Sequence, residues 1–107
     1  MNIRLATLED AEEIQKVNTE ELHYDYPLGK TKEMLELILS LDWQVIDVAE
    51  IDGEFAGYVQ ANKYLGTFGD LLVNIMGLAV SIKFQGHGVG KALMIAAEAW
   101  AKEIGAE

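Results

Sequence analysis

The sequence predicts one α/β domain, spanning residues 1–107, in the order strand, helix, helix, three strands, helix. Half of the residues are hydrophobic and only one is proline, which is typical of a folded core rather than a disordered chain. Apolar residues recur at helical spacing in three stretches, and β-rich runs occupy the gaps between them. We therefore expect a mixed, mostly antiparallel sheet flanked by helices.

The first elements follow from alternation and capping. Residues 2–6 alternate polar and apolar, which predicts a strand with Ile3 and Leu5 on its buried face. Thr7 and Asp10 then have the spacing of a capping box, with an acid at the third helical position. A first helix is expected from about Leu8 to Glu21.

A second helix and a hairpin follow. Thr31 is a candidate N-cap for a helix ending near Ser40, and four apolar residues fall on one face: Met34, Leu35, Ile38 and Leu39. The β-rich run 45–51 is followed by Asp52-Gly53, a dipeptide that favours a tight turn into a second strand. Gly57 in that strand indicates a bulge or a close backbone approach, although a merely tolerated glycine is the more common explanation.

The C-terminal part alternates loop, strand and helix. Residues 63–69 read as a loop, and the apolar run 71–80 is long enough for a central strand. Gly77 indicates either a bulge or plain packing. The last helix ends at about Gly105, and its predicted inner face consists of Val89, Leu93, Ala96, Trp100 and Ile104.

Composition limits the classes of function. Acidic residues outnumber basic ones 18 to 8, for a net charge of -10, which argues against nucleic acid and favours either solubility alone or cationic partners such as amines. The absence of cysteine and the two separated histidines argue against a metal site. No apolar run suits a membrane span and no leader is seen, so we expect a cytoplasmic protein with no membrane partner.

The turn before the last helix predicts an anion site. Gly86, Gly88 and Gly90 can turn their amides inward, and the helix that follows adds unpaired N–H groups at its positive end. A P-loop would need glycine at Gln85 and a hydroxyl at Ala92, and a dinucleotide fingerprint would need glycine at Lys91 or Leu93. Lys83, His87 and Lys91 predict a locally basic patch around this turn.

The pattern Gln85-x-x-Gly88-x-Gly90, directly after a strand ending Leu78-Ala79-Val80, resembles the acetyl-CoA signature of the GCN5-related N-acetyltransferases. The opening Ile3-Arg4-x-Ala6-Thr7-x-x-Asp10 is similar to that of many members. The resemblance implies that acetyl-CoA is the cosubstrate and that a primary amine of a small molecule or peptide is the acceptor. It assigns the pantetheine arm to the backbone of Leu78, Ala79 and Val80. It assigns the pyrophosphate to the turn formed by Gln85, Gly86, His87, Gly88, Val89, Gly90 and Lys91.

The same resemblance makes the loop between the first two helices a candidate acceptor site, formed by His23, Tyr24, Asp25 and Tyr26. The alternative is that one tyrosine ring packs under the loop. In some members a glutamate on the central strand is the general base, and its place corresponds to Asn74, whose amide cannot take up a proton. The candidates for the general base are instead Glu21, Asp25 or ordered water. A backbone N–H near Leu78 or Ala79 can stabilise the oxyanion. No residue is assigned as the catalytic acid.

The resemblance covers the N-terminal part of the family's fold and implies an incomplete domain. Without a following strand, the segment 71–80 would leave a hydrophobic edge, which predicts self-association, for example as a dimer, or a fragment of a longer protein. Two hypotheses follow. One is an N-acetyltransferase, and the other is a non-catalytic coenzyme A-binding or self-associating module.

Overall fold

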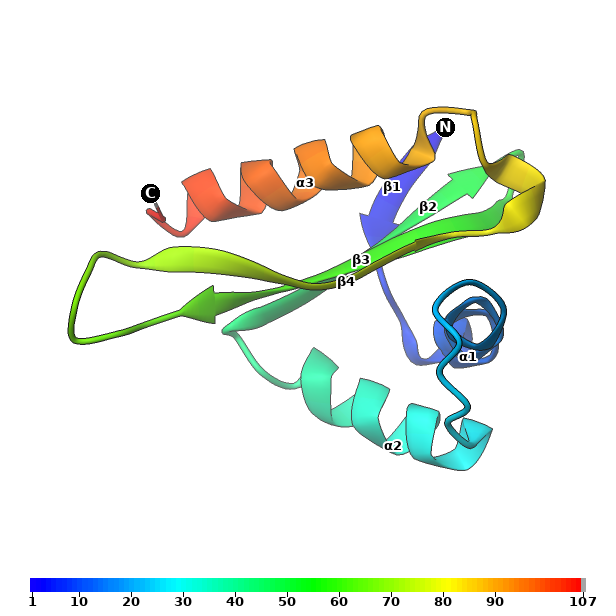
Figure 1. The fold of residues 1–107 in the computed structure, drawn as a ribbon, viewed down its shortest axis with the longest axis horizontal. Helices are drawn as coiled ribbons and strands as arrows, with labels where there is room; N and C mark the ends of the chain where they lie inside the picture. The colour runs from blue at the N-terminus through cyan, green and yellow to red at the C-terminus, as the bar shows by residue number, and fades with distance from the viewer. Residues whose placement is uncertain (107) are drawn as a thin grey trace.

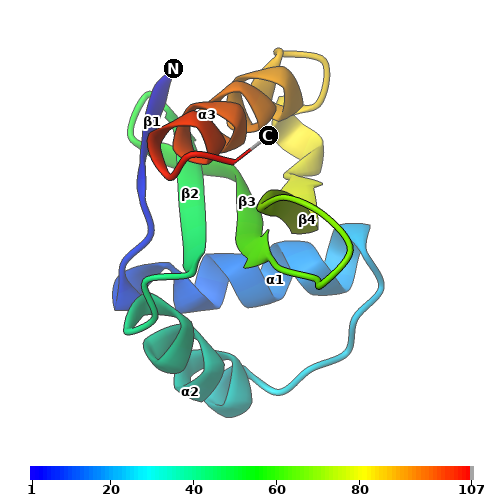
Figure 2. The same cartoon turned by 90° about the vertical axis from the view of Figure 1, so that its left-hand side faces the viewer.

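The computed structural model describes residues 1–106 and forms one four-stranded sheet between two layers of helix. The sheet has the order β1-β2-β3-β4, and all three pairings are antiparallel. Helices α1 and α2 cover one face and α3 covers the other (Figures 1 and 2). The predicted element order is therefore confirmed.

The N-terminal elements are tied together by one capping acid. Strand β1 (Asn2–Leu5) leads through a 3-10 turn, η1 (Leu8–Asp10), into α1 (Ala11–Glu21). The Asp10 carboxylate accepts the Thr7 N–H at 2.8 Å and both terminal nitrogens of Arg4 at 2.7 and 2.8 Å. The predicted capping box is confirmed, and Arg4 completes it from the preceding strand.

One buried position in this region was predicted wrongly. Ile3 packs against the cluster on the α3 side, but Leu5 is 65% exposed. Strand β1 is the outermost strand on its side of the sheet. Leu5 lines an open hollow beside Trp100, so no element covers it fully and Trp100 is only half-buried instead of being core.

Helix α2 (Leu28–Leu39) begins earlier than Thr31, the predicted cap. Pro27 is the N-cap residue, and its carbonyl accepts both the N–H and the hydroxyl of Thr31, at 2.9 and 3.2 Å. Because the cap lies at the proline, Thr31 is buried in the first turn. On the predicted apolar face Leu35 is buried and Ile38 is half-buried, whereas Met34 and Leu39 are exposed.

Strands β2 (Gln44–Ile51) and β3 (Glu54–Tyr64) form the predicted hairpin. Asp52 and Gly53 both have positive φ, 53° and 78°, as a two-residue turn of this twist requires. Strand β3 continues through Lys63 and Tyr64, which were predicted to be loop, because both pair with β4.

Strand β4 (Leu72–Val80) is the outermost strand of the described sheet, rather than a central one. Helix α3 (Val89–Glu103) then crosses the sheet, and Gly105 follows it with φ 81°, as the predicted C-cap requires. The inner face of α3 consists of Val89, Leu93 and Ala97, so the buried alanine is one residue later than predicted.

Two apolar clusters lie on opposite faces of the sheet. The first joins α1 and α2 to the sheet and includes Ile14, Leu35, Val48 and Tyr58. The second lies under α3 and includes Val59, Phe84, Val89 and Leu93. Both clusters reach the end of β4, so the segment after Val80 starts from a rigid base.

Candidate functional site

The turn after β4 has the backbone that its glycines predict. Ser81 donates its N–H to the Ala56 carbonyl at 2.8 Å, and a 3-10 turn, η2 (Ile82–Phe84), follows. Gly86 and Gly88 then adopt φ values of 85° and 79°. These left-handed conformations cost glycine nothing and would strain other residues, so they explain both glycines.

The turn ends at a set of free amide groups. The first hydrogen bond that closes a turn of α3 runs from the Ala92 N–H to the Gly88 carbonyl, at 3.1 Å. The amides of Val89, Gly90 and Lys91 precede it and therefore have no partner within the helix. Together with the positive end of the helix dipole they can bind an anion such as a phosphate group.

Buried aromatic packing holds the turn in place. Phe84 is buried in the cluster under α3, and the His87 ring meets its edge at a centroid distance of 5.9 Å. His87 Nδ1 lies 3.0 Å from the Phe84 carbonyl. The His87 side chain is thus turned back onto the loop.

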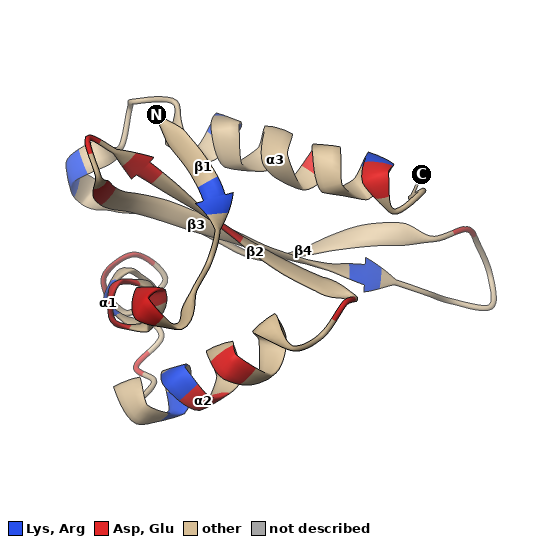
Figure 3. Ribbon diagram, turned by 180° about the vertical axis from the view of Figure 1, so that it is seen from behind, with Lys and Arg blue, Asp and Glu red and all other residues tan. Residues whose placement is uncertain are grey.

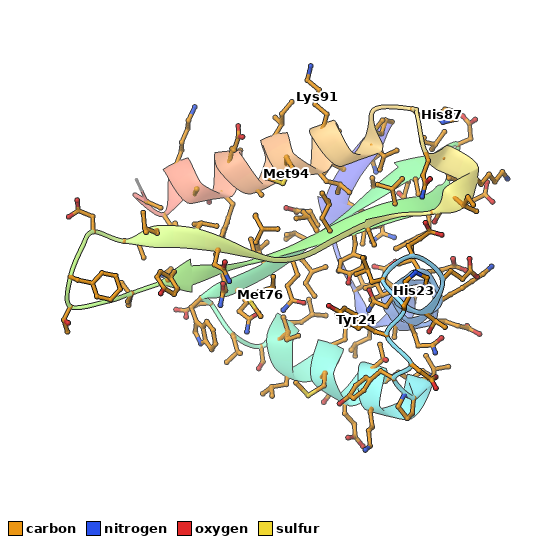
Figure 4. All side chains as sticks on the ribbon, in the orientation of Figure 1. His23, Tyr24, Met76, His87, Lys91 and Met94 are labelled. Atoms are coloured by element: carbon orange, nitrogen blue, oxygen red, sulfur yellow. The ribbon has the colours of Figure 1, made fainter. Side chains whose placement is uncertain are left out.

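The predicted basic patch is weaker than expected. Lys83 pairs with the Glu54 carboxylate at 2.8 Å, which neutralises much of its charge. Lys91 extends from the outer side of α3 into solvent (Figure 4). With the His87 ring folded back, the attraction for an anion at this turn rests mainly on backbone amides.

Gln85, the first residue of the signature, links two parts of the molecule. Its amide donates to the Glu21 carboxylate at 2.6 Å and to the Val80 carbonyl at 3.2 Å. Glu21 is the last residue of α1, directly before the predicted acceptor loop. The glycine turn, the end of β4 and the start of that loop are therefore in contact.

Strand β4 presents one free edge beside the turn. Within the described residues it pairs only with β3, and Gly57 of β3 is opposite Val80. A Cβ at Gly57 would lie 2.6 Å from the Ala79 carbonyl oxygen, so the close backbone approach predicted as one alternative is confirmed. The register shifts opposite Gln60 and Ala61, where Met76 is the extra residue. The bulge predicted at Gly77 is therefore confirmed.

The four predicted acceptor residues line one open hollow together with Asn18, which the sequence reasoning missed. The loop is hydrogen-bonded along one side of α1. The Tyr24 N–H donates to the Asn18 carbonyl at 3.0 Å, and the Thr19 hydroxyl donates to the Tyr24 carbonyl at 3.2 Å. Tyr24 and Tyr26 are both exposed, so neither ring packs under the loop.

Tyr58 is a second residue that the sequence reasoning missed. It is buried on the α1 side of β3, and its hydroxyl donates to Asn18 Oδ1 at 2.5 Å. Burial raises the pKa of the Tyr58 hydroxyl, so it stays protonated at neutral pH. The sequence carries no local signal for this contact, because the partner of Tyr58 is 40 positions away.

Comparison with known proteins decides the family. The profile of the acetyltransferase (GNAT) family matches residues 8–107. The chain belongs to the GNAT family of acetyltransferases. No curated protein matches its sequence.

Solved structures agree with the GNAT fold. A protein described as a transcriptional regulator from Bacillus halodurans C-125 superposes with a TM-score of 0.87 at 23% identity, over 99% of this chain and 77% of that one. The aminoglycoside 6'-N-acetyltransferase AAC(6')-IG from Acinetobacter haemolyticus gives 0.84 at 19% identity, over 99% and 74%. AAC(6')-Iy, described in complex with a CoA-linked acetylneamine analogue, gives 0.83 at 24% identity, over 99% and 74%.

One family position stands out in this GNAT chain. Asn74, the position that the sequence resemblance assigned to the glutamate base of some members, is exposed on β4, and its amide nitrogen lies 3.2 Å from the Met76 sulfur. An amide cannot accept the proton of the amine. Of the two carboxylates suggested instead, Glu21 is engaged by Gln85, while Asp25 is exposed on the acceptor loop.

The surroundings of the GNAT site are acidic on one side only. Helix α1 carries glutamates at both ends, Glu12, Glu13, Glu20 and Glu21, beside one lysine, whereas β4 carries no charged residue (Figure 3). Within residues 1–106 no three His, Cys, Asp or Glu side chains are placed to hold a metal ion. No helix of this part of the chain is long and apolar enough to cross a membrane.

Proposed function

We propose that this GNAT chain transfers the acetyl group of acetyl-CoA to a primary amine. The observation that carries the proposal is the position of the signature Gln85 to Gly90, which places left-handed glycines and free amides at the start of α3, directly after β4. The amides from Gly86 to Lys91, apart from that of His87, which donates to the Phe84 carbonyl, would hold the pyrophosphate. The free edge of Leu78 to Val80 would hold the pantetheine arm. The similarity to an acetyltransferase described with a CoA-linked analogue supports this arrangement.

Bonds and protons balance in the proposed transfer. The amine nitrogen attacks the thioester carbonyl, a C–N bond forms and the C–S bond breaks. The amine loses one proton, and the departing thiolate of CoA takes up one proton. A backbone N–H on the free edge of β4 can stabilise the oxyanion, because this role needs no side chain.

The acceptor would approach from the α1 side, through the hollow formed by Asn18 and the loop residues His23, Tyr24, Asp25 and Tyr26. The loop begins at Glu21, which Gln85 holds beside the cofactor turn. This contact supports placing the amine and the thioester on neighbouring surfaces. The exposed Asp25 is the carboxylate best placed to attract a cationic amine before it loses its proton.

A second candidate is a coenzyme A-binding module that does not turn over. It is favoured by Asn74, which replaces a proton acceptor with an amide. Both candidates predict cofactor binding, and only the first predicts consumption of the thioester.

One experiment separates the two candidates. The protein is incubated with acetyl-CoA and a panel of primary amines, and free thiol is followed while coenzyme A is titrated in a parallel melting curve. Because the chain has no cysteine, the released CoA is the only thiol that the assay detects. Thiol release that depends on the amine supports the transferase, a melting shift without release supports the binding module, and the absence of both contradicts the proposal.

We further propose that β4 mediates self-association. Its outer edge from Leu72 to Met76, outside the segment proposed for pantetheine, has no partner among the described strands, and both of these residues are exposed. Sedimentation velocity across a wide concentration range should show a dimer that Leu72→Lys weakens. A folded monomer at every concentration contradicts this proposal.

A further inference from the structure

The Tyr58 hydroxyl lies between Asn18 of α1 and Gly77 of β4. Its side chain is 5% exposed, and it projects from β3 toward α1, where Asn18 accepts its proton. Strand β3 lies directly beside β4, whose residues Leu78 to Val80 are the proposed binding segment for pantetheine. The hydroxyl therefore lies between the two proposed substrates.

Gly77 keeps this hydroxyl accessible from β4. A Cβ at Gly77 would lie 3.4 Å from the Tyr58 oxygen, and no other atom would be within 4 Å of it. Gly77 belongs to the bulge of β4, where the strand departs from regular pairing. The missing side chain thus leaves a gap beside the hydroxyl, one residue before Leu78.

A small apolar hollow opens on the other side of Tyr58. It has a volume of about 120 Å³ and lies between α1, α2 and the sheet. Half of its lining is aliphatic or methionine, and the polar residues of the lining are Asn18, Tyr26, Thr31, Tyr58 and Gln60. The apolar ones are Ile14, Met34, Leu35, Ile38 and Ile46. None of the described residues that line it is Asp, Glu, Lys or Arg.

The hydrogen-bond inventory of Tyr58 decides what it can bind. A phenol has one proton, which here goes to Asn18 Oδ1, so only the lone pairs of its oxygen remain free. Those lone pairs accept from an N–H group. An amine held in this way keeps its own lone pair free to attack a carbonyl on β4.

We propose that Tyr58, fixed by Asn18, binds the acceptor amine, and that the hollow selects a primary monoamine with a compact apolar body. This inference rests on the proposed acetyl transfer and specifies its substrate. The hollow is small and most of its walls are apolar, which suits a short alkyl chain. A second ammonium group against these apolar walls would meet no carboxylate, since Asp25 is not part of the lining, so polyamines and aminoglycosides gain nothing from this hollow.

The first test removes only the hydroxyl. Tyr58→Phe should lower kcat/KM for n-butylamine by about tenfold, as expected for loss of one hydrogen bond to the substrate, with KM for acetyl-CoA unchanged. Tyr64→Phe is the matched control, because Tyr64 is an exposed tyrosine on the same strand. A melting curve with coenzyme A checks that Tyr58→Phe still folds and binds the cofactor.

The second test redirects specificity. Met34 lines the hollow and is 43% exposed, so Met34→Glu should fold and place a carboxylate there. We expect this change to raise the ratio of kcat/KM for 1,4-diaminobutane to that for n-butylamine by about tenfold. Leu37→Glu, on the same helix, 52% exposed and absent from the lining, should leave the ratio unchanged.

Amine binding to the CoA-loaded protein, measured by NMR, provides a readout that does not depend on turnover. Weaker n-butylamine binding in Tyr58→Phe than in Tyr64→Phe supports the inference. Equal binding and equal kinetics in the two variants, or a preference of the wild type for neamine over n-butylamine, would overturn it. Loss of both the cofactor shift and thiol release in the wild type would instead contradict the proposed function itself.

Discussion

Replacing Gly57 with alanine should damage the cofactor side of the molecule from within the sheet. A Cβ at this position would lie 2.6 Å from the Ala79 carbonyl oxygen and 3.1 Å from the Val80 Cα, and both of these are backbone atoms. It would also lie 3.3 Å from a Val89 methyl group at the start of α3. The substitution therefore pushes on β4 and on α3 at the point where both form the proposed cofactor site.

The size of the effect follows from this overlap. The contact with the carbonyl oxygen is about 0.8 Å shorter than an ordinary van der Waals contact, and neither strand can yield without breaking its pairing. Overpacking of this kind costs about 1–3 kcal/mol. In a domain of this size each kcal/mol lowers the melting temperature by about 4–8 °C.

Thermal melting followed by circular dichroism, with and without coenzyme A, tests this expectation. Gly57→Ala should melt well below the wild type and should respond less to coenzyme A, because Ala79 and Val80 are displaced. Gly29→Ala in α2 is the control, since a Cβ there meets nothing within 4 Å. An unchanged melting temperature and an unchanged cofactor response in Gly57→Ala would refute this account of how β3 supports the site.

Three further predictions concern backbone and charge. Gly88→Ala should lower the free energy of unfolding by about 1–2 kcal/mol, because φ at this position is 79°, and Gly88→Val should also abolish the shift in melting temperature caused by coenzyme A. Gly90 lies inside α3, so Gly90→Ala should raise the free energy of unfolding by up to about 1 kcal/mol and keep the coenzyme A shift. Burial alone would raise the pKa of Asp10, but hydrogen bonds from Arg4 and Thr7 outweigh it and lower the pKa below 3.8. The ionised Asp10 therefore stabilises the folded state at pH values above 3.8, and this stabilisation is lost as pH falls through the lowered pKa. Asp10→Asn should lower the free energy of unfolding in urea by about 1–3 kcal/mol at pH 7 and by less in acid. Burial raises the pKa of Asp47 above 3.8, so the ionised Asp47 destabilises the folded state increasingly as pH rises through the raised pKa. Asp47→Asn should therefore have a higher free energy of unfolding than the wild type at pH 7, and this difference should disappear below about pH 4. Equal unfolding midpoints at both pH values would contradict either carboxylate prediction.

The two carboxylates show how context decides the role of one residue type. Asp10 and Asp47 are both nearly buried, yet their pKa values move in opposite directions. Asp10 has Arg4 and the Thr7 N–H as partners, whereas only burial acts on Asp47. The capping-box spacing predicted the role of Asp10, and nothing in the sequence near Asp47 marks its burial.

The sequence by itself determined the features that depend on neighbours a few residues apart. The capping box at Thr7, the turn at Asp52-Gly53 and the left-handed Gly86 and Gly88 each follow from backbone preferences within one or two turns of chain. The glycine turn also carried the family resemblance, which the matching profile over residues 8–107 confirms.

Only the tertiary structure decided which distant residues meet. It joined Tyr58 to Asn18 across 40 positions and Gln85 to Glu21 across 64 positions, and so connected the acceptor loop to the cofactor turn. It also left Leu5 exposed, although the alternation of residues 2–6 predicted its burial. The position of β4 at the edge of the described sheet agrees with the predicted hydrophobic edge, although the apolar run alone suggested a central strand. Hydrophobic spacing specifies which face of an element is apolar, but the order of strands in the sheet determines whether anything covers that face.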